Sequence, residues 1–74
     1  MSLNVVQALR GKPSYEAARL IGSAQQFIKD SNFVNLLNQF DLNNKKNDNN
    51  LIKQFNMFAS VPGLKEQVSA WLNS

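Results

Sequence analysis

Apolar side chains recur at intervals of three and four from residue 14 to residue 29, which is the spacing of one face of an α-helix. The residues of this stripe are Ala17, Leu20, Ile21, Ala24, Phe27 and Ile28. Ser14 is the expected N-cap, and Glu16 lies in the first turn, where the helix dipole favours an acid. Gly22 interrupts the stripe without changing its phase. We therefore expect one continuous helix over 14–29, with a break at Gly22 as the alternative, and other elements must cover its apolar face.

Shorter helices are expected on either side of this segment. The stretch GKP at residues 11–13 must end an N-terminal helix, because proline cannot continue it. The alternative apolar faces of that helix are Leu3, Val6 and Leu9, or Val5 and Leu9. Asp30 or Ser31 can cap a third helix. Its apolar face is Phe33, Leu36, Leu37 and Phe40.

Two further helices are expected after the polar stretch 41–50. The first has its expected N-cap at Asn50. Its apolar face is Leu51 or Ile52, Phe55, Phe58 and Ala59. The last helix takes Pro62 at its first position, where a missing N–H is harmless because it has no partner within the helix. Its cap is Ser60 or Val61, and its apolar face is Leu64, Val68, Trp71 and Leu72.

The fold class follows from these patterns. No stretch alternates apolar and polar residues as a strand does, and no Asn-Gly hairpin turn occurs. A chain of 74 residues fits one domain. The sequence therefore predicts an all-α fold, a compact bundle of four to five short helices in a single domain over 1–74, with a polar interhelical loop at 41–50. The expected core is Leu20, Ile21, Phe27, Phe33, Leu37, Phe40, Phe55, Phe58, Val68 and Trp71.

The polar stretch FDLNNKKNDNNLIKQF admits three interpretations. Asp41 and Asn43 occupy the first and third positions of an EF-hand register. The positions that need an oxygen ligand, a glycine and a glutamate hold Lys45, Lys46 and Ile52 instead, which argues against calcium binding. The two lysines are candidate phosphate contacts in a nucleic-acid complex. We favour a solvated connection, because Asn and Asp bond their own backbone in interhelical loops.

Composition argues against several kinds of functional site. The chain has no Cys and no His, so disulfides, thiolate chemistry, zinc sites of the usual kind and a histidine base are excluded. The three glycines are isolated and form no phosphate-binding loop. We expect no enzyme activity, no metal and no cofactor. No targeting segment or bilayer-length apolar run is visible, so we expect a protein that is cytoplasmic or otherwise intracellular, without a membrane partner.

DNA binding is one alternative function. Residues 14–30, SYEAARLIGSAQQFIKD, are similar to a helix-turn-helix signature with Gly22 at the turn. The residues that a second helix would present to the major groove are Ser23, Gln25, Gln26 and Lys29. Glutamine suits adenine edges there. However, Ser23 stands where an apolar residue usually anchors the turn, so we favour one amphipathic helix.

A small helical module that binds another protein, as an adaptor or inhibitor, is the primary hypothesis. It is favoured by elimination and by a large set of aromatic residues, namely Tyr15, Phe27, Phe33, Phe40, Phe55, Phe58 and Trp71. An apolar patch left uncovered by folding would mark a partner site or a homodimer interface. The candidate interface residues are Val5, Val6, Met57 and Trp71. The formal net charge of +3 permits an acidic partner without requiring one.

Three pieces of the chain, KPSYEAA, NFVNLLNQFD and VSAWL, resemble the helical microtubule-binding tip of dynein heavy chains. In that family an aromatic residue after Lys-Pro and an Asn-Phe…Phe-Asp segment recur in the same order. The resemblance extends from Lys12 to Leu72, and it implies an acidic tubulin surface contacted by Lys and Arg. The stretch GSAQQFI is an insertion relative to the family, the polar loop replaces an Asp-Asn-Ile continuation, and the flanking antiparallel coiled coil is not found in these residues. Microtubule binding is a further alternative.

Overall fold

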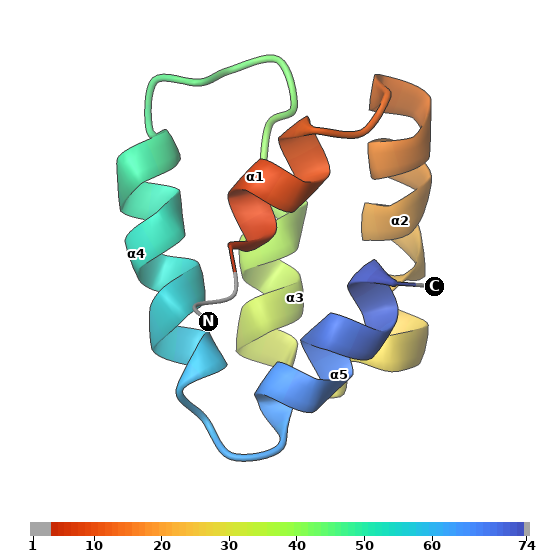
Figure 1. Ribbon diagram of the computed structural model, residues 1–74, viewed down its shortest axis with the longest axis vertical. Helices are drawn as coiled ribbons and strands as arrows, with labels where there is room; N and C mark the ends of the chain where they lie inside the picture. Colours follow the sequence, from red (N-terminus) through yellow and green to blue (C-terminus); the bar gives the residue numbers. More distant parts are fainter. Residues whose placement is uncertain (1–3, 74) are drawn as a thin grey trace.

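Five α-helices make up most of the described part of the chain, residues 4–73, in the computed structural model (Figure 1). Their bounds are α1 Val5–Arg10, α2 Ser14–Phe27, α3 Ser31–Asn38, α4 Asp48–Ala59 and α5 Leu64–Leu72. No strand occurs within residues 4–73, so the predicted all-α class is confirmed. Leu3, one candidate for the apolar face of α1, lies outside the described residues.

The helices α2 and α4 form two sides of the molecule, with α3 between them (Figure 1). Both α1 and α5 cross in front of α3 in this view, and each of them contacts both α2 and α4. A loop of residues 39–47 joins α3 to α4 at one end of the molecule, and the turn from α4 to α5 lies at the opposite end. The two crossing helices therefore tie the two sides together.

An aromatic cluster lies at the centre of the core. The ring of Phe33 on α3 makes edge contacts with Phe55 and Phe58 of α4, at centroid distances of 5.2 and 5.8 Å. It makes a third edge contact with Trp71 of α5, at 6.5 Å. The indole Nε1–H of Trp71 donates to the backbone carbonyl of Leu20 on α2 at 2.7 Å. Trp71 is fully buried, and this bond satisfies its polar atom while fixing α5 against α2.

Most of the predicted core is buried. The buried members are Leu20, Phe33, Leu37, Phe40, Phe55, Val68 and Trp71, whereas Ile21 and Phe58 pack against the core and are half-buried. The prediction that Phe27 lies in the core is wrong, because Phe27 is 40% exposed. The helix α2 ends at Phe27, and the extended backbone at the next residue turns Ile28 into the core in its place.

The helix starts are partly as predicted. The Asp30 carboxylate caps α3 by accepting from the Phe33 N–H at 2.9 Å, as expected. Asn4 caps α1 in the same way through the Gln7 N–H. Ser14 is the first residue of α2 and makes no cap bond, because Pro13 holds the N-cap position.

The predicted first residues of the last two helices are wrong. The helix α4 starts at Asp48, two residues before the expected Asn50 cap. The helix α5 starts at Leu64 with Gly63 at its N-cap, rather than at Pro62 after a Ser60 or Val61 cap. The reason is that the N–H groups of Ser60 and Val61 bond to carbonyls of α4, so both residues lie in the turn that closes that helix.

The turn into α5 depends on a glycine. Gly63 has φ of +86°, in the left-handed region that only glycine adopts without strain. We predict that Gly63→Ala lowers the free energy of unfolding by about 1–2 kcal/mol, since the added methyl meets no neighbour and only the backbone conformation is penalised. Urea denaturation followed by Trp71 fluorescence measures the change.

The same substitution at Gly22 is the matched control. Gly22 lies inside α2, is exposed, and has open space where a Cβ would lie. Gly22→Ala is therefore expected to raise the free energy of unfolding by about 0.5–1 kcal/mol. A loss of stability at Gly22, or none at Gly63, would contradict the conformations described for the two positions.

Candidate functional site

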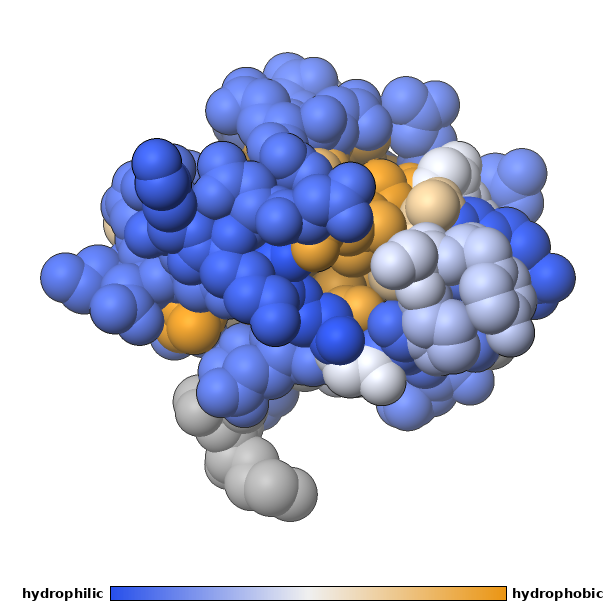
Figure 2. Space-filling model, turned by 90° about the horizontal axis from the view of Figure 1, so that it is seen from above, coloured by the Kyte–Doolittle hydropathy of each residue, from blue (hydrophilic) through white to orange (hydrophobic). Residues whose placement is uncertain are grey.

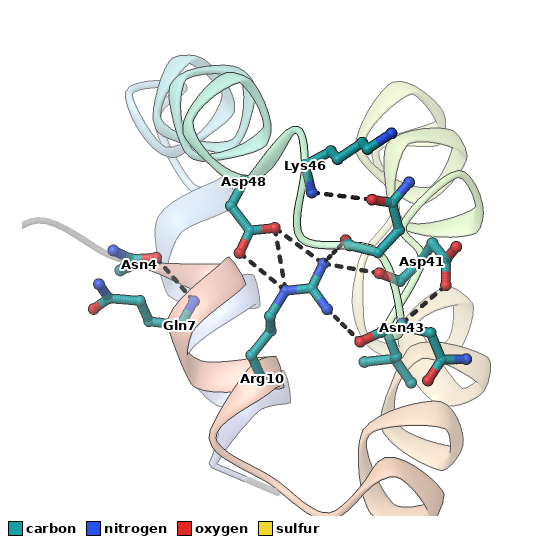
Figure 3. A network of polar contacts seen from close by, with 9 residues as sticks. Asn4, Gln7, Arg10, Asp41, Asn43, Lys46 and Asp48 are labelled. Carbon is teal, nitrogen blue, oxygen red and sulfur yellow. Dashed lines mark hydrogen bonds and ion pairs between the residues drawn. The ribbon is translucent and has the colours of Figure 1, made fainter.

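The side chain of Arg10, at the end of α1, organises the loop that precedes α4 (Figure 3). Its Nε–H donates to both carboxylate oxygens of Asp48, at 3.2 and 3.1 Å, and its Nη2 lies 3.0 Å from Oδ1. Other guanidinium protons donate to the backbone carbonyls of Asp41 (2.8 Å), Leu42 and Asn44. The Arg10 side chain is only 10% exposed, so its bonds to Asp48 and Leu42 are partly shielded from water, whereas those to Asp41 and Asn44 lie at the surface.

Local bonds within the loop support the same conformation. The Asp41 carboxylate accepts from the Asn43 N–H at 2.9 Å, and the Asn44 side chain accepts from the Lys46 N–H at 3.0 Å. Such turns satisfy backbone donors without regular structure. The loop side chains are mostly exposed, as expected of a solvated connection, but three backbone carbonyls of the loop are held by one arginine.

A groove with a partly apolar and partly polar lining lies beside this loop, with a volume of about 470 Å³. Its walls come from α2, from the end of α3 and from the start of the loop, and it is lined by Ala18, Ile21, Leu37, Asn38, Gln39, Phe40, Asp41, Leu42 and Asn43. Figure 2, which shows the molecule from the loop end, shows an apolar hollow surrounded by polar atoms. Ile21 and Leu42 are only half-buried, so the groove presents apolar side chains to solvent.

A second hollow of similar volume, about 450 Å³, lies between α1 and α5. Its lining is Gln7, Ala8, Gly11, Lys12, Ser69, Leu72 and Asn73. Among these described residues, Leu72 is the one with a large apolar side chain. The groove beside the loop has more large apolar residues in its lining, namely Ile21, Leu37, Phe40 and Leu42, and for that reason it is the candidate site.

Three of the four candidate interface residues are not available at the surface. Val5, Val6 and Trp71 are buried, which corrects the expectation that they face a partner. Both valines are covered because α1 lies against α2 and α4 at once, and Trp71 is buried in the core against Phe33. Met57 is 71% exposed on α4.

The candidate nucleic-acid residues do not form one surface. Lys45 and Lys46 are exposed on the loop at one end of the molecule, whereas Gln25, Gln26 and Lys29 are exposed near the other end of α2 (Figure 1). The hydroxyl of Ser23 is half-buried and donates to the carbonyl of Leu20 at 2.8 Å. The helix α2 is continuous through Gly22, so residues 14–30 do not form the two-helix arrangement of a helix-turn-helix.

Positive charge is in excess on the surface. Arg10 is paired with Asp48, whereas none of the seven other Lys and Arg side chains forms an ion pair with a described residue. The carboxylates of Asp30, Asp41 and Asp48 are all engaged in the bonds given above. Glu16 and Glu66 are the remaining acids, so the uncompensated surface charge is mainly cationic.

Residues 4–73 offer neither a metal-binding cluster nor a membrane-spanning helix. Among these residues, no three His, Cys, Asp or Glu side chains gather closely enough to hold a metal ion. No helix in this part of the chain has the length and apolarity that crossing a membrane requires.

Comparisons with known proteins add no assignment. No protein-family model matches the chain, and neither a curated protein nor a solved structure does.

The Arg10 contacts were missed by the sequence analysis, and they can be tested by substitution. We predict that Arg10→Lys lowers the free energy of unfolding by about 1–3 kcal/mol, because an ammonium group cannot bond a carboxylate and three carbonyls in one plane. Arg19→Lys is the control, since Arg19 is exposed on α2. That variant is expected to stay within about 0.5 kcal/mol of the original in the same urea titration. Equal effects at the two positions would show that the network contributes no stability.

Proposed function

We propose that this chain is a small non-enzymatic domain that recognises another protein, and that it binds a partner segment in the groove between α2 and the loop. The observation that supports this proposal is the solvent-facing apolar lining of the groove around Ile21 and Leu42. The segment that fits it carries an apolar side chain flanked by acidic residues.

The groove has the composition of a protein-binding surface. Its apolar residues include the buried Leu37 and Phe40 and the half-buried Ile21 and Leu42. Its rim carries the polar side chains of Asn38, Gln39 and Asn43. An apolar centre with a hydrogen-bonding rim is typical of protein interfaces, in which the centre supplies most of the binding energy and the rim excludes water.

The charges near the groove favour an acidic segment. Lys45 and Lys46 lie in the loop whose first residues form the groove wall, and both are exposed and form no ion pair with any residue of the range 4–73. Asp41 is the one acid in the groove lining, so an acidic group is favoured beside the two lysines and not beside Asp41. Acidic groups on a partner would therefore be attracted to the rim, which raises the association rate and selects the partner.

Microtubule binding is a second candidate, supported by the same excess of cations. The pieces of sequence that resemble the dynein tip lie at the start of α2, along α3 and in α5. They supply core residues such as Phe33, Phe40 and Trp71, so the resemblance concerns the packing of the helices more than the exposed residues. A tubulin surface is acidic, and the unpaired lysines are of the charge that such a surface attracts.

Selection from a displayed peptide library tests the groove, because it does not require an identified partner. The enriched peptides are expected to contain an apolar residue beside Asp or Glu. Ala18→Gln, which places a longer neutral side chain in the groove from an exposed helical position, is expected to weaken their binding about ten-fold or more, as blocking the centre of an interface does.

Ala70→Gln is the matched control, because Ala70 is exposed on α5 away from the groove. Peptides that bind Ala18→Gln as tightly as the original chain would refute the groove as the binding surface. Mixed-sequence duplex DNA is a further probe, and binding to it that falls steeply with salt would contradict a protein-recognition function.

Co-sedimentation with polymerised microtubules at low salt tests the second candidate. The chain is expected to pellet with the polymer, and Lys45→Gln together with Lys46→Gln is expected to weaken binding about five-fold, or about 1 kcal/mol for two rim charges. Lys29→Gln with Lys65→Gln is the control, which removes the same charge from exposed positions at the opposite end. Absence of the chain from the pellet would rule out microtubule binding.

A further inference from the structure

The loop before α4 surrounds a single guanidinium group with five acceptor oxygens. Three are backbone carbonyl oxygens, from Asp41, Leu42 and Asn44, and two are the carboxylate oxygens of Asp48. All three nitrogens of the Arg10 guanidinium donate to them. The ring of Phe40 lies against the group, with its centroid 4.8 Å from Cζ. The guanidinium is thus bonded around its edge and faces an aromatic ring.

The arrangement fits a planar guanidinium better than a metal ion. Its oxygens are distributed among three nitrogens of the group, so they point to different atoms rather than to one centre. Metal coordination needs oxygens that converge on a single point at about 2.0–2.6 Å. A planar ion with several N–H donors matches these acceptors, whereas a compact ammonium ion matches few of them.

The guanidinium and its surroundings come from separate parts of the chain. Arg10 belongs to α1, and its partners follow it by 31 to 38 residues. Most of the acceptors are backbone atoms held by the turns at Asp41 and Asn44, so the loop contributes its shape to the site independently of α1. The Arg10 side chain therefore occupies the loop in the way that a separate ligand would occupy a binding site.

We propose that residues 40–48 form a guanidinium-binding cage, occupied in this structure by the side chain of Arg10, which binds a free guanidinium ion when that side chain is removed. The negative charge of Asp48 and the three carbonyls would otherwise be left without their donors, at a site where Asp48 is only 27% exposed. A small planar cation restores them. The cage shares Phe40, Asp41 and Leu42 with the groove wall, but no partner is needed to fill it.

Chemical rescue tests the cage. Arg10→Ala is expected to lower the melting temperature, and millimolar methylguanidinium is expected to raise it again along a saturable curve, because the ion binds the folded state alone. Methylammonium at the same concentration is expected to give a much smaller rise. Arg19→Ala, with the cage still occupied, is expected to show no rise with either ion. A double variant with Arg10→Ala and Asp48→Asn is expected to lose the rescue.

The original chain provides a test that does not depend on whether Arg10→Ala folds. Arg19 is the other arginine of the chain and is exposed, so the two Nε–H signals can be compared in one NMR spectrum. Solvent exchange of the Arg10 Nε–H is expected to be about ten-fold slower than that of Arg19, or slower still. Equal exchange at the two arginines, or a rise with methylguanidinium that is as large in Arg19→Ala as in Arg10→Ala, would overturn the proposal.

Discussion

The helices of this chain are too short to be stable alone, so the fold depends on the aromatic contacts around Phe33. The helices range from 6 to 14 residues, and isolated helices shorter than about 12–15 residues are marginal in water. Phe33 brings α3, α4 and α5 together through three edge contacts, and Trp71 extends the connection to α2 by its bond to the Leu20 carbonyl. Four of the five helices are thus linked through two adjoining aromatic rings.

The aromatic cluster does not connect α1 to the other helices, and Arg10 supplies that connection. The helix α1 is the shortest of the five, and it buries Val5, Val6 and Leu9. Its last residue then bonds the loop and the first residue of α4, so α1 is attached by apolar packing along its length and by polar bonds at its end. The Arg10–Leu42 bond also fixes a residue of the groove wall. The geometry of the groove therefore depends on a residue that does not line it.

The sequence predicted what depends on local patterns and missed what depends on distant contacts. The apolar spacing predicted the all-α class and most of the core, and Asp30 was one of the two predicted caps of α3 because a cap bond spans only three residues. The exposure of Phe27 could not be predicted, since it depends on where α2 ends and on the turn that buries Ile28.

The candidate site was beyond sequence reasoning for the same reason. The partners of Arg10 are 31 to 38 residues away and are largely backbone carbonyls. Since every residue has a backbone carbonyl, the residue types do not indicate which of them accept a bond. A cation in the last turn of a helix is favourable in any case, so Arg10 did not stand out. The groove requires α2 to lie beside the end of α3, and no spacing in the sequence indicates that arrangement.

Because Arg10 bonds backbone carbonyls, the conformation of the loop does not depend on the side chains of Lys45 and Lys46. Within the loop, the bonds that hold its shape involve the side chains of Asp41 and Asn44, while Arg10 and Asp48 act from the flanking helices. Lys45 and Lys46 contribute no side-chain bond to this framework. Their side chains can therefore be exchanged with little effect on folding, since exposed residues away from such networks rarely change stability by more than about 0.5 kcal/mol. The exposed side chains of Lys45 and Lys46 can therefore change while the backbone of the loop stays fixed.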